Sequence, residues 1–174
     1  GFYWDYGQKR RLVNADEMMI NLSTQFDYNY ASNQVLVETK RLKAIGGFDE
    51  AFVACQDYDT WSRLIEKFGA AKRVAGASYI IHRGDETPRL TESNNWLKGH
   101  DQFMDKHNTK MTKNNRINQQ FRRMIAQQNK MTIVQLIEQI KAGLFKQKVR
   151  YFLSSNLSLI SSVRKYFLEA KKVK

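Results

Sequence analysis

The stretch that decides the fold of this chain is GGFDEAFVACQDYDTWSRLIEKFG, residues 46–69. Four apolar residues in its second half are spaced three and four positions apart: Trp61, Leu64, Ile65 and Phe68. Because such positions share one face of an α-helix, the spacing predicts a helix with one buried stripe. Gly69 stands where a left-handed residue commonly ends a helix. One turn before Trp61, the same stripe reaches Asp57.

Asp57 is the candidate functional residue of this stretch. It is expected in the first helical turn, where unpaired backbone N–H groups and the helix dipole favour a negative side chain. An ionised carboxylate that faces inward at a helix start suits a general base, provided a pocket opens above it. Most aspartates at such a position, however, only cap their helix. By contrast, Asp59 lies about 200° around the axis from Asp57 and is expected to face solvent or cap the helix.

Two adjacent glycines, Gly46 and Gly47, follow a short helix predicted over residues 39–45. Glycine adopts positive φ at no steric cost, so the pair predicts a helix end followed by a tight loop. Without side chains, the pair also lets backbone pass close to a ligand.

GGFDE, a short spacer, QDYDTWSRL and a glycine-ended helix together resemble the C-terminal half of family 2 glycosyltransferases of the GT-A fold, over roughly residues 1–90. That family typically follows GGFDE with an acidic-Asp-Tyr-Asp-x-Trp-x-Arg segment, whose second residue is the proposed catalytic base and matches Asp57. Gln56 stands where the family usually has Glu, and its polar side chain has similar reach to orient the base or an acceptor hydroxyl. The resemblance implies an inverting enzyme that transfers a sugar from a nucleotide-activated donor to a glycan or lipid-linked acceptor, as in bacterial surface polysaccharide synthesis.

The resemblance also implies an acceptor side around the base. The residues expected to bind or orient the acceptor are Gly46, Gly47, Gln56 and Trp61. Arg63, in the same helix, is expected to be structural rather than catalytic.

A donor side is implied by two further segments. Ser32 and Asn33 match a segment that lies beside the bound sugar in the family, although a polar strand edge explains them equally well. His82 ends a predicted strand over 77–82, where related enzymes place a His that contacts the metal or the nucleotide diphosphate. A His ligand would favour Mn²⁺ over Mg²⁺. A His that only hydrogen-bonds the following loop is an equal alternative.

The nucleotide-binding part of such a fold is not recognisable here. Parallel nucleotide-binding sheets begin with a βαβ unit, and nothing between residues 1 and 46 reads as one. Asp5 stands alone, without the Asp-x-Asp metal motif of the family. The expected fold is therefore α/β, the acceptor-side half of a GT-A domain. The donor half and most ligands of its divalent cation, Mn²⁺ or Mg²⁺, would lie outside this chain.

Local patterns predict three strands and one further helix. The strands are expected at residues 2–6, 35–37 and 77–82, from their aromatic and β-branched residues. The apolar run over 35–37 is expected to be buried. A short helix is expected over residues 15–22.

The charge is unevenly distributed. Residues 1–98 hold 13 Lys and Arg against 13 Asp and Glu, whereas residues 99–174 hold 16 against four. The whole net charge of +12 thus belongs to the second part. We expect a balanced domain over 1–98 and a basic helical tail over 99–174. A single cysteine excludes an internal disulfide and fits a reducing cytoplasm.

The tail is expected to form amphipathic helices over 131–145 and 157–173, separated by a break at 154–156. Basic helices of this kind lie on anionic membranes, or they pack on the domain with their basic faces outward. We therefore expect a cytoplasmic protein, with a peripheral position at the inner face of the membrane as one interpretation. The rival function is a non-catalytic basic module that binds nucleic acid or membrane. Nucleic acid is not expected, because the aromatic residues of the tail lie within apolar faces instead of forming stacking platforms.

Overall fold

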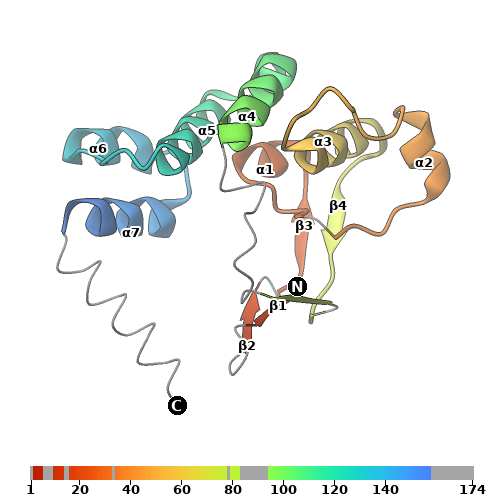
Figure 1. The fold of residues 1–174 in the computed structure, drawn as a ribbon, viewed down its shortest axis with the longest axis horizontal. Coiled ribbons are helices and arrows are strands. Elements are labelled where there is room, and N and C mark those ends of the chain that lie inside the picture. The colour runs from red at the N-terminus through yellow and green to blue at the C-terminus, as the bar shows by residue number, and fades with distance from the viewer. Residues whose placement is uncertain are drawn as a thin grey trace. The chain divides into compact units, whose positions relative to one another are not determined.

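The computed structural model describes residues 2–5, 10–13, 16–32, 34–77, 79–82 and 94–157 (Figure 1). The chain is mixed α/β and divides into two compact units, Gly1–His107 and Asn108–Lys174. The fold class is thus α/β, as the sequence predicts.

The boundary between the units lies after His107, beyond the expected position at residue 98. Helix α4 (Asn94–His107) spans the expected boundary and belongs to the first unit. Its Phe103 is fully buried, stacks on Tyr58 at 4.0 Å and meets Phe26 edge-on. The charge pattern placed the boundary too early because it does not register this apolar contact.

Two small sheets belong to the first unit. Strand β1 (Phe2–Asp5) pairs antiparallel with β2 (Arg10–Val13) and parallel with β5 (Tyr79–His82). In the second sheet, β3 (Met18–Ile20) pairs antiparallel with β4 (Ala71–Arg73). The strands predicted from the aromatic run at the start of the chain and from the run ending at residue 82 are confirmed.

The helix predicted over 15–22 is wrong. Residues 18–20 form β3, and helix α1 (Leu22–Asp27) begins only afterwards. The side chain of Asn21 accepts a hydrogen bond from the backbone N–H of Thr24 and so fixes the helix start at that position.

Helix α3 (Gln56–Phe68) is the central element of the first unit and contacts α1, α2 (Thr39–Ala44) and α4 (Figure 1). Three residues of its predicted apolar stripe are buried, Trp61, Leu64 and Ile65, whereas Phe68 in the last turn is 38% exposed. Gly69 ends the helix at φ 91°, as predicted.

Residues 34–38 do not form the predicted buried strand. They belong to no sheet in the described part of the chain, and the side chain of Leu36 is fully exposed. An extended apolar segment is stable as a strand only when a neighbour satisfies its backbone groups, and no described strand pairs with this one.

The second unit contains α5 (Lys113–Ala126), α6 (Ile133–Ile140) and α7 (Phe145–Asn156). Capping boxes at Thr112 and Thr132 begin the first two helices. The core is formed by Phe121, Met131 and Leu136.

Two predictions for the tail are corrected. The helix expected over 131–145 ends at Ile140, because Gly143 and Leu144 adopt positive φ and turn the chain into α7. The expected break at 154–156 is absent. Helix α7 continues to residue 156, and the hydroxyls of Ser154 and Ser155 find acceptors within it, at carbonyls three residues earlier. Of the helix expected over 157–173, only Leu157 lies within the described residues.

A buried lysine connects the three helices of the second unit. The side chain of Lys148 is fully buried. Its Nζ donates to Oδ1 of Asn118 on α5 at 2.6 Å and to the carbonyl of Gln139 on α6 at 2.7 Å. Amide oxygens thus replace the water that this ammonium group loses on burial.

Among the described helices, none combines the length and the apolar character that a membrane crossing requires.

Candidate functional site

Asp57 is the second residue of α3 and is half-buried. Its Oδ2 accepts a hydrogen bond from Nδ2 of Asn29 at 3.0 Å, and its Oδ1 accepts one from the backbone N–H of Tyr58 at 2.7 Å. Together the two donors fix the direction of the carboxylate. The residue therefore keeps contact with solvent while its orientation is fixed.

The side chain of Asn29 is itself held in place by Gln25, which is fully buried in α1. Nε2 of Gln25 donates to Oδ1 of Asn29 at 2.8 Å, and the Tyr58 hydroxyl donates to the Gln25 carbonyl at 2.7 Å. Sequence reasoning missed Asn29, because it lies 28 positions before Asp57. No motif or periodicity marks it.

The loop after α2 carries both glycines in left-handed backbone, Gly46 at φ 81° and Gly47 at φ 73°. Arg63 connects this loop to α3, donating from Nη1 to the Ile45 carbonyl at 2.6 Å and from Nη2 to the Gly47 carbonyl at 2.7 Å. A Cβ added at either glycine would meet no atom within 4 Å in the described structure. The loop is thus fixed through its carbonyls while its outer side stays open.

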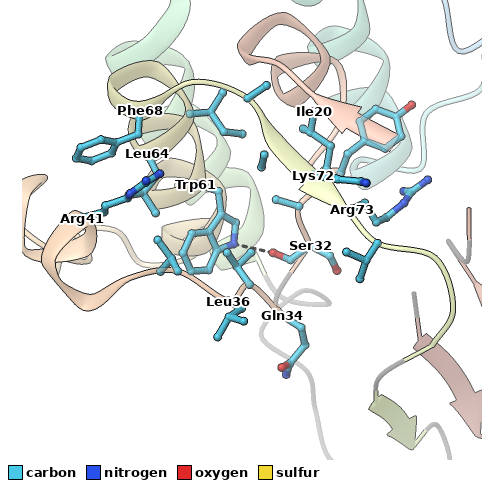
Figure 2. A pocket seen from close by; sticks show the side chains of 18 of the residues that line it. Ile20, Ser32, Gln34, Leu36, Arg41, Trp61, Leu64, Phe68, Lys72 and Arg73 are labelled. Carbon is cyan, nitrogen blue, oxygen red and sulfur yellow. Dashed lines mark hydrogen bonds between the residues drawn. The ribbon is translucent and has the colours of Figure 1, made fainter. Parts of the chain in front are cut away.

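Trp61, another of the predicted acceptor residues, is buried. Its Nε1 donates to the Ser32 carbonyl at 2.7 Å (Figure 2), and Phe48 meets its ring edge-on. Gln56 is the half-buried first residue of α3. Trp61 follows Asp57 by one helical turn. Its indole N–H is hydrogen-bonded to the segment at Ser32 and not to Asp57.

A cavity of about 720 Å³ lies beside Trp61 (Figure 2). Leu64 and Phe68 of α3 and Leu36 contribute apolar lining, and basic residues come from α2 and β4. The basic lining residues are Arg41, Lys72 and Arg73. Asp57 and the two glycines are not among the residues that line this cavity.

Asp59 does not face solvent, and the expectation from its helical angle is corrected. Its side chain is fully buried. Oδ1 accepts from Nε2 of His107 at 2.8 Å and lies 3.1 Å from Nζ of Lys106, while Oδ2 accepts from Nε of Arg63 at 2.8 Å. The helical angle correctly places Asp59 away from the side of Asp57. Helix α4 covers the side of α3 on which Asp59 lies, however, so the carboxylate is buried. Asp59 is thus the buried centre of the contact between the two helices.

The environment of Asp59 favours its ionised form. Burial raises the pKa of this carboxyl, and hydrogen bonds from His107, Lys106 and Arg63 outweigh that effect, lowering the pKa to about 2 from the usual 3.8.

Acid should therefore destabilise the first unit. A carboxyl with a lowered folded-state pKa contributes its full stability above pH 3.8 and loses it as the pH falls towards 2. The shift of about two pH units corresponds to roughly 2 kcal/mol in the free energy of unfolding. Urea denaturation of the chain between pH 5 and pH 2 measures this loss. An Asp59→Asn variant should lack that share of the pH dependence, and an unchanged pH slope in the variant would contradict the assignment.

His82 lies at the end of β5 with its side chain largely exposed, and its Nδ1 is 3.5 Å from Oδ2 of Asp5 on β1. Asp5 is buried and also lies 3.4 Å from Nε of Arg10. Asp5 is thus not isolated, because the parallel pairing of β1 and β5 sets it opposite His82. A His and a carboxylate are two suitable ligands for Mn²⁺. The described residues bring no third His, Cys, Asp or Glu to them.

Of the neighbouring donor-side candidates Ser32 and Asn33, only Ser32 lies within the described residues. Ser32 adopts φ 62° and lines the cavity beside Trp61. Asn33 lies outside the described residues.

Comparison of the chain with protein-family models, with curated proteins and with solved structures finds no match.

Proposed function

We propose that this chain is the acceptor-side part of an inverting GT-A glycosyltransferase of family 2, with Asp57 as its catalytic base. The observation that carries the proposal is the carboxylate of Asp57, half-buried at the start of α3 and oriented by Asn29. It follows the Gly46-Gly47 loop, which Arg63 holds against the same helix. A carboxylate oriented by an amide and a backbone N–H, with remaining exposure to solvent, is suited to accept a proton from a bound hydroxyl.

In the proposed reaction, Asp57 takes the proton of the acceptor hydroxyl. The acceptor oxygen forms a bond to the anomeric carbon of the nucleotide sugar, and the bond from that carbon to the diphosphate oxygen breaks on the opposite face. The nucleoside diphosphate leaves with the bonding electron pair, so the anomeric configuration inverts. Gly46, Gly47 and Gln56 would bind the acceptor, and Trp61 would support that side by anchoring the segment at Ser32.

The donor-side part of the domain would cover the cavity beside Trp61. Two features support this: the exposed apolar segment that contains Leu36, and the apolar lining from Leu64 and Phe68. Apolar surface of this kind is stable when another layer of the same domain packs against it.

A divalent cation, Mn²⁺ or Mg²⁺, would stabilise the charge of the departing diphosphate. The donor-side part would supply most of its ligands. Within this chain, His82 and the neighbouring Asp5 are the residues with suitable chemistry to assist.

The acceptor would be a glycan or a lipid-linked glycan. A cytoplasmic enzyme at the inner face of the membrane would meet a lipid-linked acceptor there. The basic second unit supports such a position, because anionic lipids attract clustered Lys and Arg.

The 174-residue chain alone should show no sugar transfer, because the nucleotide-binding part is not recognisable in it. The assay is release of nucleoside diphosphate from a panel of nucleotide sugars with Mn²⁺ or Mg²⁺, alongside the complete enzyme as positive control. Metal-dependent turnover by this chain alone would contradict the division into donor and acceptor parts.

A further inference from the structure

We propose that the second unit binds anionic membrane surfaces through the outer faces of α6 and α7. The inference adds a defined interaction surface to the protein and does not depend on the transfer reaction.

Helix α6 carries apolar residues on more of its circumference than its neighbours cover. Leu136 is buried in the core of the unit, and Ile140 packs against that core. Three further apolar side chains are exposed: Ile133 by 55%, Val134 by 58% and Ile137 by 61%. Positions i, i+1 and i+4 span about 100° of a helix, so these three form one contiguous face. Isolated exposed apolar residues are ordinary, but a contiguous face of this kind marks an interaction site.

Helix α7 has an outer face that combines two cations with an apolar residue. Lys146, Arg150 and Leu153 follow one another at intervals of four and three positions and are all exposed. They therefore share one side of the helix. Neither of the two cations forms an ion pair with a described residue. Within the described part of the chain, their charge is therefore available to an external anion.

The charge of the unit identifies the partner. Residues 108–174 hold 15 Lys and Arg against two Asp and Glu, a net charge of +13. A second copy of the chain would bring the same charge to the contact and be repelled. Nucleic acid would satisfy the cations but leave the isoleucines in water. An anionic bilayer offers negative headgroups above an apolar layer, which matches both features.

Helix α6 is eight residues long, which corresponds to about 12 Å and is far shorter than the hydrocarbon core of a bilayer. The proposed contact is therefore interfacial, with the isoleucines at the boundary between headgroups and acyl chains.

The test is co-sedimentation of the full 174-residue chain with vesicles of phosphatidylcholine containing about 30% phosphatidylglycerol, and with phosphatidylcholine alone. We expect strong partitioning to the anionic vesicles only, and we expect added salt to weaken it. Each basic residue near an anionic surface raises the partition coefficient by about tenfold or less. Ile133→Gln with Ile137→Gln should lower the partition coefficient at least about tenfold. The matched control is Ile125→Gln on α5, an isoleucine that is also exposed, and it should bind like wild type.

A second double variant removes charge instead of apolar surface, so the membrane contact can still be tested if the isoleucine variant folds poorly. Lys146→Gln with Arg150→Gln should reduce binding about tenfold. Lys43→Gln with Lys98→Gln removes the same charge from exposed positions of the first unit and should have little effect. Circular dichroism melts establish that each variant is folded.

Three results would overturn the proposal. The first is equal vesicle binding by wild type and both variant pairs. The second is a wild-type dimer that the isoleucine variant converts to monomer. The third is salt-sensitive DNA binding without any preference for anionic vesicles. Asp57→Asn should leave vesicle binding unchanged, so failure of the membrane surface and failure of the proposed transfer reaction are distinguishable.

Discussion

Replacing Asp57 by asparagine in the complete enzyme should lower the rate of sugar transfer by roughly 10²–10⁴-fold. The amide has nearly the same shape as the carboxylate but cannot take the proton of the acceptor hydroxyl. Its oxygen can still accept the hydrogen bond that Asn29 now donates to Oδ2. The fold should therefore persist, and kcat should fall while affinity for the nucleotide sugar, which the donor part binds, barely changes.

Steady-state rates with saturating donor, together with direct measurement of nucleotide-sugar binding, separate these two effects. A thermal melt of the variant controls for unfolding. A variant that retains wild-type kcat would remove Asp57 from the chemistry and leave it as a helix cap.

Replacing Asp59 by asparagine should lower the free energy of unfolding of the first unit by about 3–5 kcal/mol, the usual cost of removing one partner from a buried ion pair. The carboxylate is fully buried, and its loss would leave Arg63 and His107 without their common anion. Because Arg63 also holds the Gly47 carbonyl, the loop after α2 should loosen as well.

Urea denaturation of the 174-residue chain measures this change. Asp57→Asn serves as the matched control, since it makes the same chemical change two residues earlier at a half-buried position. It should stay within about 1 kcal/mol of wild type. Equal stability of the two variants would contradict the central position of Asp59 between α3 and α4.

Local patterns were sufficient to predict the helix that carries the candidate site. The spacing of Trp61, Leu64 and Ile65 defines α3, and Gly69 ends it, because both signals depend on neighbours within one or two turns. The positive φ of Gly46 and Gly47 followed from their lack of a side chain.

Long-range packing was not predictable in the same way. The helical angle gives the direction of Asp59, but nothing near it in the sequence states that His107, 48 positions later, covers that direction. The partnership of Asp57 with Asn29 across 28 positions is hidden for the same reason. The segment containing Leu36 has the composition of a buried strand, yet a strand also requires a partner, and composition says nothing of partners.

The assignment of the base is tested most directly by transfer rates of Asp57→Asn and Asp59→Asn in the complete enzyme, each divided by its folded fraction. We expect Asp57→Asn to be slowed by roughly 10²-fold or more, while Asp59→Asn stays within about tenfold of wild type per folded molecule. If Asp59→Asn were the inactive enzyme and Asp57→Asn the active one, Asp57 would not be the catalytic base.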